Sequence, residues 1–286
     1  MALDITALTV ATVPSVSELM NWNDHFQSGR FAAEPRTWAF RGQPQLFQNL
    51  APSFSRAVSS SAHAAAELIE RELIDDFRKH YAILPDRSAD MPQPTDIGPG
   101  ADLKCLSVMQ HYEVPTRLLD WTSDFWIALY FACGTDPGAD AELWLYDRQI
   151  LVSHDQSRQD ELAAIEARVG SSSEPATFAR RSERLLAEVD PRLTPRMKQQ
   201  LAHHTVAANV FDDHAQLLND LATQANETKP DTWYFRRFVI QSACKPKVLK
   251  FLADHKKITA STIFPDVVGL GRFLRWQFES LRTMLT

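Results

Sequence analysis

The sequence has few cysteines, and their arrangement argues against two common uses of that residue. Cys105, Cys133 and Cys244 are the three cysteines among 286 residues. They are far apart, odd in number and without the two-residue spacing of a zinc-binding pair. Neither a disulfide framework nor a thiolate zinc site is therefore expected. Cys133 ends an apolar run, so we interpret it as a small core residue rather than a nucleophile.

Long apolar runs and an excess of positive charge are also missing. No stretch approaches the roughly 20 apolar residues that a membrane-spanning helix needs. The first ten residues have no basic segment ahead of their apolar residues, as a signal peptide would, so we expect a cytoplasmic protein. The formal net charge is -6 and the pI is about 5.8. This balance argues against a mainly electrostatic grip on nucleic acid, although a local basic pocket remains compatible with it.

Several motifs of well-known enzymes are absent. The sequence contains no GxGxxG, GxxxxGK[ST], GxSxG or HExxH pattern, so dinucleotide-fold, P-loop, hydrolase-elbow and zinc-protease interpretations have no motif support. Histidines and aspartates gather between residues 203 and 214, at His203, His204, Asp212, Asp213 and His214. Their spacing matches no metal-binding motif, so no metal site is expected.

The polar and apolar patterning predicts one α+β domain over residues 1–286, with small mixed or antiparallel sheets flanked by helices. We expect an N-terminal helical part at 14–36, a core at 37–150, a helical insertion at 151–230, and a strand with helices at 231–286. Predicted helices cover 14–28, 63–81, 103–112, 120–133, 245–255 and 266–285. Predicted strands cover 37–41, 142–146 and 235–240, with an irregular segment at 50–56 and an exposed loop at 85–100.

The first candidate for a functional residue is Arg41. It ends an aromatic strand, Trp38-Ala-Phe-Arg41, and precedes Gly42 and Gln43. A glycine there would let a ligand approach the backbone, and a guanidinium fork suits phosphate or carboxylate. A surface arginine paired with a nearby aspartate is the competing interpretation.

The second candidate is the block from 110 to 122, which precedes a buried apolar helix. Polar groups beside such a helix either satisfy one another or face a pocket. Arg117 and Asp120 can form a structural pair or contact a ligand, and His111 can be a core histidine. A helix starting at Asp120 or Thr122 would present backbone N–H groups that attract anions. The candidate residues in this block are Gln110, His111, Thr116, Arg117, Asp120, Trp121, Thr122 and Ser123.

These blocks resemble the FRG domain, a bacterial family named for its Phe-Arg-Gly motif. Phe40-Arg-Gly-Gln43 is followed by Leu50-Ala-Pro-Ser-Phe-Ser-Arg56, and then by the block from Gln110 to Ala132, with Glu113 where glycine is usual. A third family element is similar to 195–205 and contributes Gln200, although Leu201, Ala202 and His204 depart from the family pattern. A closing Phe-Pro-Asp element lies at 263–270.

The arrangement is similar, more distantly, to the ADP-ribosyltransferase superfamily. That resemblance implies an ADP-ribosyltransferase-like core, NAD as co-substrate, and Arg41 as the group that holds its dinucleotide. Thr122 and the helix start would orient the nicotinamide side. The catalytic glutamate of such enzymes has no clear counterpart, so Gln200, Asp120 and His111 are the residues expected to take part in catalysis.

The resemblance implies an ADP-ribosyltransferase or NAD glycohydrolase, acting as a toxin or in defence against phage. Three other functions stay open. One is a non-catalytic module that binds a nucleotide or a modified macromolecule. Another is a different transferase or a hydrolase that uses Asp120 and His111 as acid and base. The third is a reader of nucleic acid, which the acidic balance disfavours.

Overall fold

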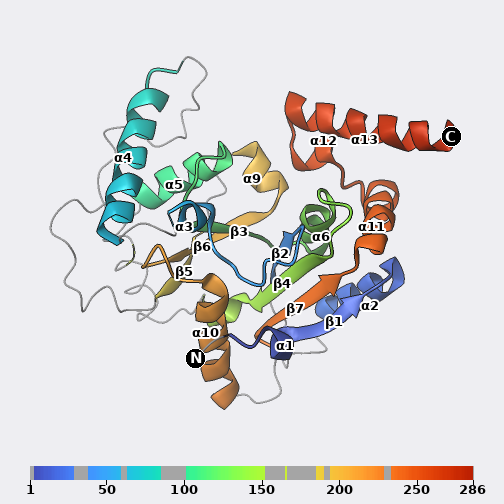
Figure 1. Ribbon diagram of the computed structural model, residues 1–286, viewed down its shortest axis with the longest axis horizontal. Coiled ribbons are helices and arrows are strands. Elements are labelled where there is room, and N and C mark those ends of the chain that lie inside the picture. Colours follow the sequence, from blue (N-terminus) through green and yellow to red (C-terminus); the bar gives the residue numbers. More distant parts are fainter. Residues whose placement is uncertain are drawn as a thin grey trace.

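The computed structural model describes residues 3–28, 38–58, 63–84, 101–151, 165, 185–189, 194–228 and 233–285. Thr37, Gly29, the loop predicted at 85–100 and most of 152–184 lie outside these residues. Seven strands form one mixed sheet in the order β1-β7-β4-β2-β3-β6-β5 (Figure 1). The strands are β1 Thr9–Val13, β2 Trp38–Gln43, β3 Leu118–Thr122, β4 Ala141–Asp147, β5 Leu186–Val189, β6 Ala202–Ala207 and β7 Phe235–Ile240.

The sheet is single and mixed, which corrects the expectation of several small sheets. β1 runs parallel to β7, and every other neighbouring pair is antiparallel. Helices and single turns surround the sheet. They are α1 Ile5–Leu8, α2 Val16–Gln27, α3 Ser53–Ala57, α4 His63–Tyr81, α5 Ala101–His111, α6 Phe125–Cys133, η1 Arg148–Ile150, α9 Pro195–Gln199, α10 His214–Thr228, η2 Ser242–Cys244, α11 Lys245–Phe251, the π-helical turn η3 Leu252–Lys256, α12 Ala260–Ile263 and α13 Val267–Leu285.

Local chemistry explains the confirmed elements. The Ser15 side chain accepts a hydrogen bond from the backbone N–H of Glu18 and caps α2 as predicted. Strands β4 and β7 follow the predicted ranges closely. The predicted helix at 245–255 appears as α11 followed by η3, and α13 extends to Leu285. Among the described residues, no helix is long and apolar enough to cross a membrane.

The helix predicted at 120–133 begins five residues later than its first residue. Asp120 and Thr122 lie in β3, and Asp124 is the cap, because its carboxylate accepts hydrogen bonds from the N–H groups of Trp126 and Ile127. Four residues at 120–124 are good cap types, so composition alone did not identify the one that starts the helix. The anion-attracting helix start proposed at Asp120 and Thr122 is therefore wrong.

The predicted helical insertion also needs correction. Within 151–230, β5 and β6 are strands that extend the sheet beyond β3. The alternation in β6 is hidden because all six of its residues are buried, including three polar ones. The segment predicted to be irregular at 50–56 includes most of α3, which ends at Ala57.

Each face of the sheet has its own core. On one face, Phe40, Leu143 and Phe238 pack against α2, α6 and α11. On the other face, Trp121 and Tyr146 pack against α10. Alternate residues of the strands supply these two cores, as the two-residue period of a strand requires.

Candidate functional site

The candidate site lies where β2 and β3 separate. These neighbours share a single paired position, Phe40 with Thr122, although β2 pairs with β4 along its whole length. Beyond that position the Arg41 side chain bridges the two strands, and its Nη1 donates to the Asp120 carbonyl at 2.8 Å. The opening between the strands forms part of a cavity of about 870 Å³.

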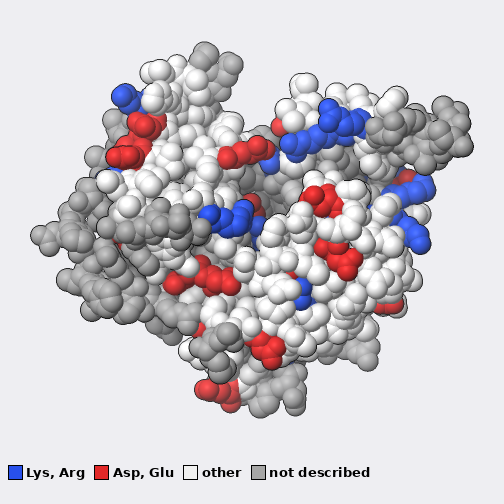
Figure 2. Space-filling model, viewed as in Figure 1, with Lys and Arg blue, Asp and Glu red and all other residues white. Residues whose placement is uncertain are grey.

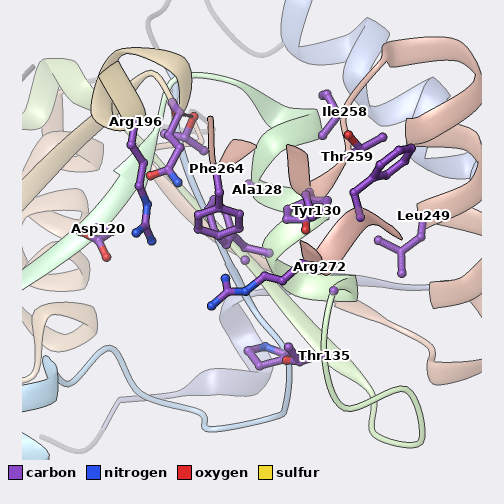
Figure 3. A pocket seen from close by; sticks show the side chains of 18 of the residues that line it. Asp120, Ala128, Tyr130, Thr135, Arg196, Leu249, Ile258, Thr259, Phe264 and Arg272 are labelled. Carbon is purple, nitrogen blue, oxygen red and sulfur yellow. Dashed lines mark hydrogen bonds between the residues drawn. The ribbon is translucent and has the colours of Figure 1, made fainter. Parts of the chain in front are cut away.

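Several strands and helices surround this cavity. Strands β2 and β3 supply Arg41 and Asp120, and α6 supplies Tyr130 and Phe131. The other walls come from α9, from α11 with η3, and from α12 with α13, as Figure 3 shows from close by. The charged residues lining it, among those that the structure describes, are Asp120, Arg41, Arg196, Arg272 and Arg275. The cavity is therefore basic and partly aromatic, although the whole chain is acidic.

Asp120 is the single carboxylate among the described residues of the lining. Its side chain is 53% exposed, and its oxygens lie 3.2 Å from His204 Nε2 and 3.1 Å from Gln110 Nε2. Thr116 in turn donates from its hydroxyl to the Gln110 side-chain oxygen. Gln110, Thr116 and His204 thus hold the Asp120 carboxylate in place while it stays accessible. Neither Gln110 nor Thr116 is among the lining residues.

Arg41, Gly42 and Gln43 follow one another on β2 but lie in different surroundings. Burial lowers the pKa of Arg41, and the nearby Asp120 partly opposes that shift. A Cβ at Gly42 would lie 1.9 Å from the Ala128 carbonyl oxygen, so this glycine permits close packing of α6 on β2. The Gln43 amide donates to the Asn49 carbonyl and to the buried Glu142. Gln43 is therefore a structural residue outside the cavity lining.

Arg117 also proves structural. Its guanidinium forms a two-point ion pair with Glu70, and both side chains are 3% exposed. It also donates to the Ala208 carbonyl at 3.0 Å. Arg117 pairs with Glu70 and not with Asp120, which corrects the two interpretations considered for it. Such buried pairs hold elements in register, here α4 against β3 and the end of β6.

The hydroxyl of Thr122 faces inward and is already bonded. Its Oγ1 donates to the Gln200 carbonyl at 2.7 Å and accepts from the Asp124 N–H. The Gln200 amide donates to the Ile263 carbonyl at 3.2 Å, so it joins α9 to α12. Thr122 and Gln200 line the cavity, but these bonds make them wall-forming groups.

Trp121 and Ser123, two further candidates, make mainly structural contacts. Trp121 contributes to the lining, yet its indole N–H donates to Thr205 within the opposite core. Ser123 is partly buried and donates its N–H to the Leu201 carbonyl, without lining the cavity.

His111 sits on α5 and does not line the cavity. Its Nδ1 is 3.3 Å from the Thr194 hydroxyl. Burial lowers the pKa of His111, the charge of Arg196 lowers it further, and Asp266 opposes both effects. The histidine beside Asp120 is His204, so the expected pairing of Asp120 with His111 is replaced by one that the sequence did not suggest.

The histidine cluster at 203–214 is divided between separate environments. His204 faces Asp120, whereas His214 accepts or donates at Thr205 Oγ1, 2.8 Å away, within the opposite core. Burial lowers the pKa of His214 to about 3. Among the described residues, no group of three histidine, cysteine or acidic side chains is placed to hold a metal ion.

Sequence reasoning missed the residues that give the cavity its charge. The Arg196 guanidinium carbon lies 4.4 Å from the centre of the Phe264 ring, and that of Arg272 lies 4.8 Å from it. Arg196 belongs to the third family element and Phe264 to the closing one, so both lay within recognised motifs. Nothing in the sequence distinguishes Arg272 from other basic residues of α13.

Comparison with known proteins gives one finding. No curated protein and no solved structure matches the chain. The family model of the FRG domain matches residues 36–140, somewhat over a third of the chain. That range contains β2, α5, β3 and α6, and therefore both Arg41 and Asp120. The segment that forms the floor of the cavity is therefore the part of the chain that is similar to the FRG domain.

Proposed function

We propose that the cavity binds NAD and that the protein splits the nicotinamide–ribose bond, as an ADP-ribosyltransferase or an NAD glycohydrolase. The observation that carries the proposal is the meeting of Arg41, Asp120, Thr122 and Gln200 in one cavity of about 870 Å³. Its size falls within the range of ligand pockets. Its arginines suit phosphates, and its aromatic walls suit flat rings.

Asp120 is the residue proposed to act on the reacting bond. When the glycosidic C–N bond breaks, its electron pair leaves with the nicotinamide nitrogen, and positive charge develops on the ribose. An accessible carboxylate fixed by neighbouring hydrogen bonds can stabilise that charge. Water or another acceptor then adds to the ribose carbon and releases a proton. His204 and Gln110 are positioning residues, because they bond the carboxylate from behind.

The reaction would suit a toxin or a phage-defence effector, since removing NAD or modifying a macromolecule harms the cell in which it occurs. The test is nicotinamide release by the purified protein and by Asp120→Asn, which keeps the shape and loses the charge. Release by the wild type and a loss of about a hundredfold or more in the variant are expected. Equal release by both proteins would contradict the role of Asp120.

One observation favours a second function, a nucleotide-binding module without catalysis. No glutamate is among the described residues of the lining, and the Gln200 amide is occupied by the Ile263 carbonyl. Binding of NAD by calorimetry, with no release of nicotinamide over hours, would favour the module over the enzyme.

A further inference from the structure

Two arginines at one side of the cavity share an aromatic ring and lack a carboxylate partner. Arg196 comes from α9 and Arg272 from α13, and both guanidinium groups lie against Phe264. In the part of the chain that the structure describes, neither guanidinium group makes a hydrogen bond or an ion pair to a side chain. The ring attracts each cation, and both guanidinium groups keep N–H donors that no described side chain accepts, with Arg272 exposed to solvent and Arg196 partly buried.

Carboxylates lie near Arg196, but among the described residues none forms an ion pair with Arg196 or Arg272. Arg196 is partly buried, and burial lowers its pKa, which Glu113, Asp120 and Asp266 oppose from a distance. The positive charge of Arg272 lowers the pKa of Arg196 further. Two neighbouring guanidinium groups with no counter-ion in contact repel each other, and an anion that contacts both groups would offset that repulsion.

The view into the cavity supports a shared ligand. In Figure 3 the side chains of Arg196 and Arg272 reach from separate ribbons toward the space that Asp120 also borders, with Phe264 between them. Figure 2 shows a hollow on this face, with basic side chains gathered along the α13 side. The two guanidinium carbons can be no farther apart than the sum of their distances to the ring centre, a span that a phosphate or diphosphate can bridge.

We propose that Arg196 and Arg272 form a clamp for the diphosphate of the bound nucleotide, and that Arg41 does not. Arg41 already uses Nη1 to bridge the separated strands β2 and β3. Arg41 therefore mainly holds the floor of the cavity together, whereas Arg196 and Arg272 bind the diphosphate of the ligand near the opening. The inference rests on the proposed function in taking the ligand to be a dinucleotide.

The experiment is calorimetric titration with ADP-ribose, which carries the diphosphate and needs no turnover. The proteins are the wild type, Arg196→Met, Arg272→Met and the double variant. Lys198→Met is the control, because Lys198 is exposed on the same helix as Arg196 and does not line the cavity. Each clamp substitution should weaken ADP-ribose binding about tenfold or more, since hydrogen bonds to charged groups are the stronger kind.

The control should bind as the wild type does, and all variants should keep the wild-type unfolding temperature. Unchanged ADP-ribose affinity in the double variant, or no ADP-ribose binding by the wild type, would overturn the clamp. Nicotinamide release is measured on the same samples. A clamp that binds ADP-ribose in a protein that releases no nicotinamide would refute the enzymatic proposal alone. Release of nicotinamide with unchanged ADP-ribose affinity in the variants would refute the clamp alone.

Discussion

Replacing Gly42 by alanine should destabilise the protein through a collision between α6 and β2. A Cβ at this position would lie 1.9 Å from the Ala128 carbonyl oxygen and 2.5 Å from the Ala132 nitrogen, whereas real Cβ contacts under 3.0 Å are essentially never seen. Both atoms belong to the helix backbone, so no side chain can rotate away. The helix must therefore move from the strand by about 1 Å or more, into a close-packed core that resists such a shift.

The expected loss in the free energy of unfolding is about 3 kcal/mol, the upper end of the usual overpacking cost, or somewhat more. Urea denaturation followed by tryptophan fluorescence measures it. Gly138→Ala is the matched control, because its added Cβ meets nothing within 4 Å, and its effect should stay within about 0.5 kcal/mol.

The result also separates two roles for Gly42. A loss below about 0.5 kcal/mol would refute the packing argument. If such a stable variant also lost ligand binding, the glycine would instead serve the approach of a ligand to the backbone, as the sequence suggested.

Three other outcomes are expected. Gly269→Ala should weaken ADP-ribose binding measured by calorimetry, because the added Cβ would lie 1.9 Å from the carbonyl oxygen of Phe264, whose ring contacts both clamp arginines. Gly271→Ala is the control, because its added Cβ meets nothing within 4 Å, and it should leave that affinity unchanged. Because buried His214 has a pKa of about 3, the imidazole takes up a proton in the unfolded chain as pH falls below 6.5, whereas in the folded protein it stays neutral until about pH 3. Its contribution to stability is thus lost between about pH 6.5 and 3, by about 2 kcal/mol at pH 5, and urea denaturation of His214→Gln should lack this loss. Lys245→Met should cost about 3 kcal/mol or more in urea denaturation, because the three N–H groups of the buried ammonium are shared among four backbone carbonyl oxygens at 2.8 to 3.1 Å, and methionine offers no donor to them. A cost under 0.5 kcal/mol for Lys245→Met, an equal pH slope for His214→Gln, or equal affinities of the two glycine variants would contradict these arguments.

Much of the secondary structure follows from local pattern. The capped helix after Ser15, the buried helix ending at Cys133 and the alternating strand at 142–146 are set by residues close in sequence. Strand β6 was missed because it is buried along its whole length, so it shows no alternation between polar and apolar residues. The single sheet depends on pairings between distant segments, which no local pattern records.

The structure brings Arg41 and Asp120 together in one cavity, and it gives several other candidate residues structural partners. Arg41 and Asp120 do meet across β2 and β3, as the two motif blocks predicted. From the sequence, Arg117 could pair with Asp120 or contact a ligand, because its actual partner, Glu70 on α4, lies 47 residues away in the chain. Arg272 carried no signal, since its place beside Phe264 depends on how α13 packs against α12.

Residues with the right chemistry can therefore be found from motifs, whereas their partners cannot. Gln43 is an example. Its side-chain amide could bind a ligand, but in the structure it donates a hydrogen bond to the buried carboxylate of Glu142. A sequence read alone does not show which polar groups are already satisfied by one another.

The most direct test of the central claim is nicotinamide release from NAD by the purified protein, with Asp120→Asn measured beside it. We expect release by the wild type and a loss of about a hundredfold or more in the variant, with NAD binding retained. No release by the wild type under any condition, together with no NAD binding by calorimetry, would contradict the account.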